Sequence, residues 1–90
     1  IGCGVAIPHG KSASVKKTCV AIAKLKEPIE WETIDGEPVQ VVILFAVDDK
    51  DKTNYFIKLM SEVARLLARE DFCRNLLSAK DKNELLRLFQ

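Results

Sequence analysis

Three apolar segments in the first half of the chain have patterns that predict β-strands. Residues 3–7 are apolar and lie between a glycine and Pro8, which is typical of a short strand. Residues 15–26 interleave large apolar side chains with small or charged ones and are rich in β-branched residues, which favours a second strand. Residues 39–47, "VQVVILFAV", are the most apolar, and such a run suits a strand covered on both faces. Residues 27–37 carry the signals of a loop.

Helical periodicity replaces the strand patterns from about Tyr55 onward. Apolar residues then recur at three- and four-residue steps with charged residues on the opposite side, which predicts an amphipathic helix. Thr53 or Asn54 is placed to cap this helix. Residues 72–79, preceded by Asp71, predict a second, shorter helix. The apolar positions of the first helix are Phe56, Leu59, Met60, Val63, Leu66 and Leu67.

A third helix is predicted at the C-terminal end. Residues 81–84, "DKNE", have the spacing of a capping box in which Glu84 reaches back to the start of the helix. Its apolar face would consist of Leu85, Leu86 and Phe89. Strands followed by helices predict an α/β domain with helices packed on a sheet. Three such helices cover one face of the sheet better than the other. Helices that precede residue 1 would cover the second face, so we expect residues 1–90 to be the C-terminal part of a single domain.

Composition narrows the classes of function. The chain has 90 residues, of which 48% are hydrophobic and 30% charged, as in folded globular domains. The net charge of +1 gives no electrostatic reason to expect nucleic acid or an anionic membrane as a partner, and the longest apolar run is too short to cross a bilayer. Cys3, Cys19 and Cys73 lack the spacing of a disulfide framework or a zinc site, which favours buried thiols in a reducing cytoplasm.

His9, the only histidine, is the candidate reactive group. It stands in "GVAIPHGK", which predicts a turn at the end of the first strand. A neutral imidazole has a nitrogen lone pair that can attack phosphorus or bind a metal. Pro8 holds the preceding strand extended, and Gly10 can adopt unusual φ values and leaves room for a bulky group. Lys11 can offset the charge of a phosphate, so this arrangement suits phosphorylation of a histidine.

Other roles for His9 are also compatible with the residues around it. A histidine in a loop is often simply solvated or hydrogen-bonded. A hydrolytic triad is not expected, because the sequence has no G-x-S-x-G motif, although Ser12 and Ser14 lie close to His9 in the sequence. A metal site is not expected, because the available partners lack the spacing of ligands. Those partners are Cys3, Asp48, Asp49 and Asp51.

The segment "GCGVAIPHG" resembles the active-site motif of the enzyme IIA domain, mannitol/fructose type, of the bacterial phosphoenolpyruvate-dependent sugar phosphotransferase system. That family also includes nitrogen-regulatory IIA relatives. Gly4 to Gly10 fill the pattern of a glycine, aliphatic residues around an alanine, Pro-His and a small residue. Further segments resemble the family in the same order along essentially the whole chain: "PIEW" at 28–31, Asp35-Gly36, "VQVVILFAV", "KLMSEVARLL" at 58–67 and "LLSAKDKNELLRLF" at 76–89.

The resemblance implies a mixed sheet sandwiched between helices (α/β/α) and a role in phosphoryl transfer. The family's histidine, here His9, accepts a phosphoryl group from the histidine-containing phosphocarrier protein. It passes the group to a cysteine of the IIB component, which phosphorylates the sugar. No cofactor and no nucleic acid are implied. The domain is expected to be cytoplasmic and not inserted in the membrane, either fused to or docking on a membrane IIC transporter.

Two departures from the family pattern keep alternatives open. An arginine that lies beside the family's histidine would precede Ile1, as would an N-terminal helical portion. Many members have a second histidine where this chain has Phe56, or Tyr55 in a shifted alignment, and phenylalanine cannot donate a hydrogen bond to a phosphate. One alternative is therefore a regulatory IIA-like module, of the nitrogen-linked or transcription-regulator type, without sugar transport. Another is an unrelated α/β domain in which His9 is incidental.

Overall fold

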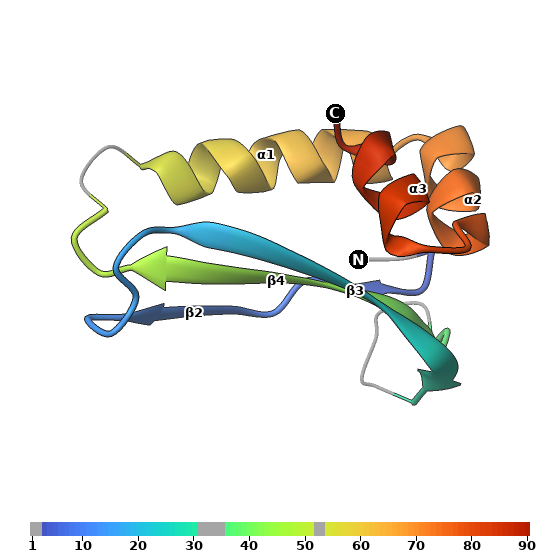
Figure 1. Ribbon diagram of the computed structural model, residues 1–90, viewed down its shortest axis with the longest axis horizontal. Helices are drawn as coiled ribbons and strands as arrows, with labels where there is room; N and C mark the ends of the chain where they lie inside the picture. Colours follow the sequence, from blue (N-terminus) through green and yellow to red (C-terminus); the bar gives the residue numbers. More distant parts are fainter. Residues whose placement is uncertain (1–2, 31–35, 52–53) are drawn as a thin grey trace.

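A mixed sheet with β4 at its centre organises the computed structural model, which describes residues 3–30, 36–51 and 54–90. β1 and β2 pair with β4 in parallel, and β3 pairs with it in antiparallel orientation. All three helices lie on the same side of the sheet (Figure 1). The α/β class and the mixed sheet are thus confirmed. The described elements are β1 (Val5–Ala6), β2 (His9–Ser12), β3 (Cys19–Ile29), β4 (Val39–Asp48), α1 (Tyr55–Leu67), α2 (Glu70–Ser78) and α3 (Lys82–Leu88).

Strands β1 and β2 follow one another along the same edge of β4. Because β3 pairs along one edge of β4, from Val39 to Ala46, β1 and β2 share the other edge. Pro8 separates them, since it has no N–H to donate to the ladder, but its carbonyl still accepts from the Phe45 N–H at 3.0 Å. The prediction of a turn at His9 is therefore wrong. His9 is the first residue of β2 and pairs with Phe45.

The side chains of β4 alternate between a buried face and an open face. The intervening residues are half-buried or exposed, and Leu44 is 43% exposed. Within the described residues, helices therefore cover one face of β4, as three C-terminal helices allow, and the other face stays open. The buried residues are Val39, Val41, Ile43, Phe45 and Val47.

All three helices contribute apolar side chains to the core on the covered face. Val63 and Leu67 of α1, Leu76 of α2 and Leu85 of α3 belong to one cluster with the buried side chains of β4 other than Val39. Leu86, however, is 52% exposed, so the prediction that it faces the core is wrong. It follows the buried Leu85 by one position, and adjacent residues of a helix do not share a face.

The boundaries of β3 differ from those predicted. The strand begins at Cys19 rather than at residue 15, because Val15 N–H donates to the Ser12 carbonyl in a turn that follows β2. It continues through Pro28 to Ile29, where a loop was predicted; proline is tolerated because β3 is an edge strand. The side chain of Cys19 is exposed, contrary to the prediction of buried thiols, since Cys19 pairs with a residue of the open face.

Predictions elsewhere in the chain have mixed outcomes. Helix α2 begins at Glu70, so Asp71 lies within its first turn rather than before it. The third helix is capped as predicted at its start, because the Asp81 carboxylate accepts from the Glu84 N–H at 2.8 Å. Glu84 reaches back to the N–H of Lys80, which lies one residue before the cap. Trp31 and Asp35 lie outside the described residues.

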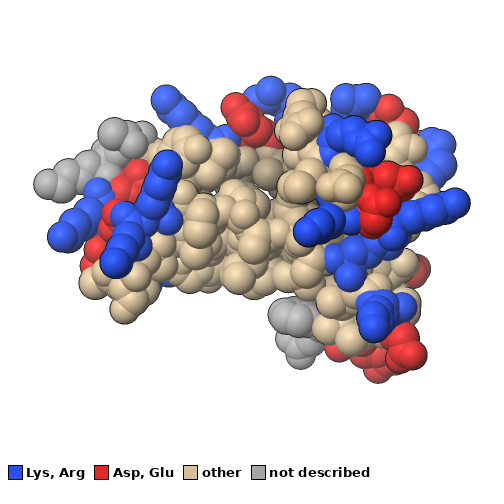
Figure 2. Space-filling model, viewed as in Figure 1, with Lys and Arg blue, Asp and Glu red and all other residues tan. Residues whose placement is uncertain are grey.

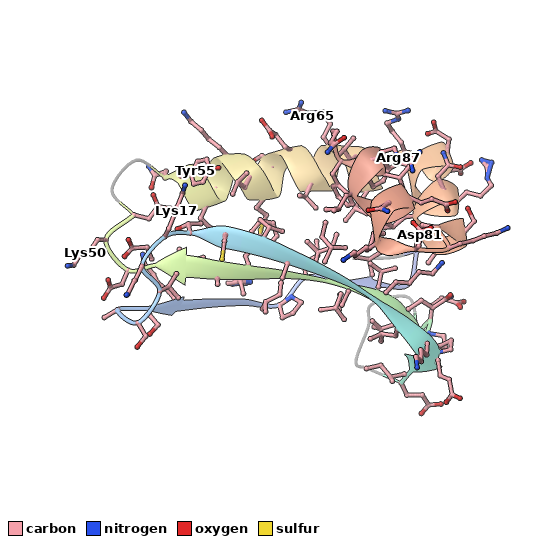
Figure 3. The ribbon with its side chains drawn as sticks, in the orientation of Figure 1. Lys17, Lys50, Tyr55, Arg65, Asp81 and Arg87 are labelled. Carbon is pink, nitrogen blue, oxygen red and sulfur yellow. The ribbon has the colours of Figure 1, made fainter. Side chains whose placement is uncertain are left out.

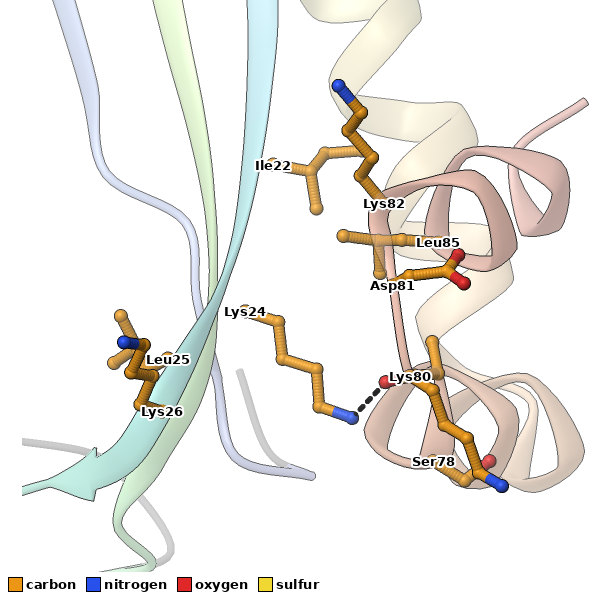
Figure 4. Close-up of a pocket in the computed structure, with 10 residues that line it drawn as sticks. Ile22, Lys24, Leu25, Lys26, Ser78, Lys80, Asp81, Lys82 and Leu85 are labelled. Atoms are coloured by element: carbon orange, nitrogen blue, oxygen red, sulfur yellow. Dashed lines mark hydrogen bonds between the residues drawn. The ribbon is translucent and has the colours of Figure 1, made fainter.

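Lys24 joins β3 to the end of α2. It pairs with Val41 and so lies on the helix-facing side of the sheet. Its ammonium group donates to the carbonyls of Leu77 and Ala79 across a hollow of about 540 Å³ (Figure 4). These carbonyls end α2, where a positive charge is favourable. We therefore interpret this hollow as the place where Lys24 connects the sheet to α2, and not as a binding site.

Replacing Lys24 by methionine is expected to lower the free energy of unfolding by about 1 kcal/mol, because the last carbonyls of α2 lose a charged donor. Denaturant unfolding of the full-length protein measures the change. Lys26→Met is the matched control, since Lys26 lies exposed on the same strand. Equal effects of the two substitutions would contradict a specific capping role for Lys24.

Candidate functional site

Strand alternation places His9 on the helix-facing side of the sheet. Val5 is buried and pairs with Val41, and His9 pairs with the equally buried Phe45. Successive side chains of a strand point to opposite faces, so positions 5, 7 and 9 share the face that carries the helices. His9 is nevertheless exposed. The imidazole is therefore accessible at the covered side of the sheet.

An aromatic contact connects His9 to the core. The ring centroids of His9 and Phe56 are 5.5 Å apart, with an interplanar angle of 35°. Phe56 also meets Phe45 edge-on, at 5.5 Å and 71°. Phe56, at the start of α1, thus lies between a fully buried ring and the imidazole. The structure brings together the histidine and the residue predicted to be its neighbour.

A cavity of about 160 Å³ opens beside the imidazole. Three of the predicted phosphoryl-site neighbours, Gly10, Lys11 and Phe56, line it together with His9, whereas Pro8 does not. Gly10 does not use the unusual φ values open to glycine, and a Cβ added there would meet no atom within 4 Å. The full lining is His9, Gly10, Lys11, Val47, Asp51, Asn54, Phe56 and Ile57.

Asp51 caps helix α1, a role that the sequence pattern did not indicate. Its two carboxylate oxygens accept from the N–H groups of Tyr55 at 3.1 Å and Phe56 at 2.9 Å. Asn54 stands at the N-cap position in a left-handed conformation (φ 57°) and makes no side-chain cap hydrogen bond, so that prediction is wrong. Thr53 lies outside the described residues. An aspartate four residues before the helix has no standard capping spacing, so no simple sequence signal identifies it.

A hydrogen-bonded turn after β4 places Asp51. The Thr18 hydroxyl oxygen, which is buried, accepts from the Asp48 N–H at 3.0 Å. The Asp48 carboxylate accepts from the Lys50 N–H at 2.9 Å, and its carbonyl accepts from the Asp51 N–H at 3.0 Å. The turn is thus anchored both to the end of β4 and to the segment before β3.

Charged side chains gather at the end of the molecule where α1 begins. Figure 2 shows basic side chains there beside acidic ones, next to a broad uncharged area, and further charged side chains at the opposite end of the molecule. Lys17, Lys50 and Tyr55 lie at this end (Figure 3). Lys11, which is exposed, is the lysine that lines the cavity beside His9. Among the described residues that line this cavity, Lys11 would therefore supply the ammonium group for a dianion at the imidazole.

Metal and membrane sites are not found in the part of the chain that the structure describes. In residues 3–30, 36–51 and 54–90, no three His, Cys, Asp or Glu side chains are grouped so that they could hold a metal ion. No helix of the same residues has the length and apolar character needed to span a bilayer.

Curated PTS-system and nitrogen regulatory proteins resemble this chain. The 2-O-alpha-mannosyl-D-glycerate-specific EIIABC component of Escherichia coli K12 is 37% identical over 87 residues, which are 96% of this chain and 13% of that protein. The nitrogen regulatory protein of Bradyrhizobium diazoefficiens is 36% identical over 81 residues, which are 90% of this chain and 52% of that protein. The chain thus spans only part of these relatives.

Solved structures share the fold. The nitrogen regulatory protein IIA-Ntr from Neisseria meningitidis has a TM-score of 0.88 at 27% identity, over 99% of this chain and 60% of that one. The IIA mannitol protein from Escherichia coli has a TM-score of 0.74 at 22% identity, over 100% of this chain and 63% of that one. Residues 1–90 match the family described as phosphoenolpyruvate-dependent sugar phosphotransferase system, EIIA 2. The chain therefore belongs to this EIIA family of phosphotransferase-system proteins.

Proposed function

We propose that His9 is the phosphoryl acceptor of a relay that runs from a phosphohistidine on a carrier protein to a cysteine of a IIB component. The observation that carries this proposal is the placement of the only imidazole of the chain. It is exposed, belongs to the first residue of β2, whose backbone pairs with Phe45, and borders a cavity of about 160 Å³. Membership of the EIIA family supports phosphoryl transfer as the reaction.

The covalent part of the first transfer involves only the two imidazoles. A lone pair of neutral His9 attacks phosphorus, and a new N–P bond forms as the N–P bond of the carrier breaks. The electron pair of the broken bond stays on the ring nitrogen of the carrier, and one proton passes from the His9 ring to the carrier imidazole. In the second step a cysteine thiolate of IIB forms an S–P bond as the N–P bond of His9 breaks. The electron pair of that bond returns to the ring nitrogen, and the ring takes up the proton that the cysteine thiol released.

The neighbours of His9 contribute positioning and charge rather than covalent chemistry. Lys11 lines the cavity and can offset part of the phosphoryl charge. Pro8 interrupts the pairing with β4 just before His9 while its carbonyl keeps the strand attached to Phe45. Gly10 also lines the cavity, and a Cβ added there would meet nothing within 4 Å.

The partners follow from the same chemistry. The donor is a histidine-containing phosphocarrier protein, and the acceptor is a IIB component or domain. This pair of partners fits a cytoplasmic domain that is fused to or docks on a IIC transporter.

Incubation of the full-length protein with phosphoenolpyruvate, the general relay enzyme and the carrier tests the proposal. An acid-labile phosphate that peptide mass spectrometry maps to His9 is the expected result. Absence of phosphate at His9 under conditions in which the carrier is phosphorylated would refute it.

A regulatory role is the second candidate, favoured by two observations. The nitrogen regulatory IIA-Ntr structure matches 99% of this chain with a TM-score of 0.88. In addition, Phe56, which cannot donate a hydrogen bond to a phosphate, contacts the imidazole. A chase of the phosphorylated protein with IIB components separates the two roles. Phosphate that leaves His9 for a IIB cysteine supports the relay, whereas phosphate that stays on His9 and changes partner binding supports regulation.

A further inference from the structure

We propose that Asp51 and Phe56 are positioning residues for His9: the Asp51 carboxylate holds the first turn of α1, and this turn presses the Phe56 ring against the imidazole. The proposal rests on the proposed function, because it concerns the same histidine. It assigns a role to an aspartate and a phenylalanine that have no covalent part in the transfer. Both line the cavity beside His9.

The first step of the argument is the dependence of the α1 start on Asp51. Asn54 is in a left-handed conformation and offers no side-chain cap. The N–H groups of Tyr55 and Phe56 are instead satisfied by the two oxygens of Asp51, at 3.1 and 2.9 Å. A carboxylate at a helix N-terminus also interacts favourably with the helix dipole. Removal of this carboxylate would leave two amide groups without their acceptor and loosen the turn that carries Phe56.

The second step is the position of the Phe56 ring. Phe45, which is fully buried, supports it edge-on from the core side. The other side of Phe56 meets the imidazole, with ring centroids 5.5 Å apart. Among the residues that the structure describes, the His9 ring has no hydrogen-bond partner. Contact with Phe56 is therefore an interaction that can restrict rotation of the imidazole.

The third step connects this restriction to the reaction. In-line transfer requires the lone pair of His9 to meet phosphorus in one orientation, and a free side chain spends most of its time in other rotamers. If the ring is already held in that orientation before the carrier arrives, less side-chain entropy is lost on reaching the transition state. Loss of either positioning residue is therefore expected to lower the maximal rate of phosphoryl transfer to His9 by about tenfold, with little change in the KM for the carrier.

The first experiment observes the imidazole directly, without any phosphorylation. Proton–carbon NMR spectra of the full-length protein are recorded, and the His9 ring signals are assigned by their loss in His9→Gln. Phe56→Leu is expected to remove the ring-current shift of these signals, and Asp51→Ala to reduce it. Phe56→Tyr, which keeps the ring, is expected to retain it. Unchanged signals in Phe56→Leu would overturn the proposal, even if His9 proves not to be a phosphoryl acceptor.

The second experiment measures transfer from the phosphorylated carrier to the same variants. Phe56→Leu and Asp51→Ala are expected to lower kcat by about tenfold, and Phe56→Tyr to recover most of the rate. Asp49→Ala is the matched control, because Asp49 is an exposed carboxylate in the same turn that does not line the cavity. Wild-type kcat in both test variants would overturn the proposal while leaving His9 as the acceptor. A loss equal to theirs in Asp49→Ala would overturn it as well.

Discussion

Substitution of His9 by glutamine is expected to abolish phosphorylation of this domain while the fold is retained. Glutamine has a similar length and can form hydrogen bonds, but it has no nitrogen lone pair able to attack phosphorus. We expect phosphoryl transfer to fall by at least about a thousandfold. Radiolabelling from phosphoenolpyruvate through the carrier protein measures this loss. Residual labelling at wild-type level would show that another residue accepts the phosphoryl group.

The stability of the His9→Gln variant separates a chemical role from a structural one. The imidazole is exposed, so its removal is expected to change the free energy of unfolding by no more than about 0.5 kcal/mol. Lys11→Met is a useful comparison, since it removes the neighbouring charge and keeps the nucleophile. Its labelling is expected to be slower by about tenfold but not abolished. A destabilised His9→Gln protein would mean that the lost labelling reports on the fold instead.

Substitution of Phe45 by alanine has the largest expected effect on stability. The ring is fully buried on the covered face of β4 and supports Phe56 edge-on. Removing a buried aromatic side chain costs about 3–5 kcal/mol, because apolar contacts are lost and a cavity remains. This cost approaches the whole stability of a typical small domain, about 5–15 kcal/mol. Denaturant unfolding of the full-length protein measures it.

Leu86→Ala is the control for the core substitution. Leu86 is 52% exposed on α3, although the sequence pattern placed it on the apolar face. Its replacement is expected to cost less than about 1 kcal/mol. The conservative Phe45→Leu variant, which keeps most of the buried volume, is expected to cost less than Phe45→Ala and to remain folded for the labelling assay. Similar losses for Leu86→Ala and Phe45→Ala would contradict the assignment of the core.

The elements that the sequence predicted well are those with a long, regular apolar pattern. The strand predicted at residues 39–47 is observed as Val39–Asp48, and the helix predicted from about Tyr55 is observed as Tyr55–Leu67. The helix repeats its apolar residues at three- and four-residue steps, and the strand is a nearly unbroken apolar run, so each gives a strong signal in the sequence. Boundaries near Pro8 and Pro28 were predicted less well. A proline removes one hydrogen-bond donor but does not prevent the strand from continuing along an edge of the sheet.

The candidate site around His9 was predicted only in part. The alternation from Val5 through Ile7 to His9 is visible in the sequence and places the imidazole on the covered face once the strand is known to continue past Pro8. Asp51 could not be predicted in the same way. Its role depends on a turn that Thr18 and Asp48 hold in place, and Thr18 is distant from that turn in the sequence.

By itself, the sequence determined the α/β class, the central apolar strand, the amphipathic helix and the histidine with its flanking proline and glycine. Local periodicity and residue chemistry are sufficient for these, because they act over a few neighbouring positions. Only the tertiary structure decided that Phe56 contacts His9, that Asp51 caps α1 and that Lys24 caps α2. These contacts join residues whose distances depend on how the sheet and helices pack, and no local pattern in the sequence encodes that packing.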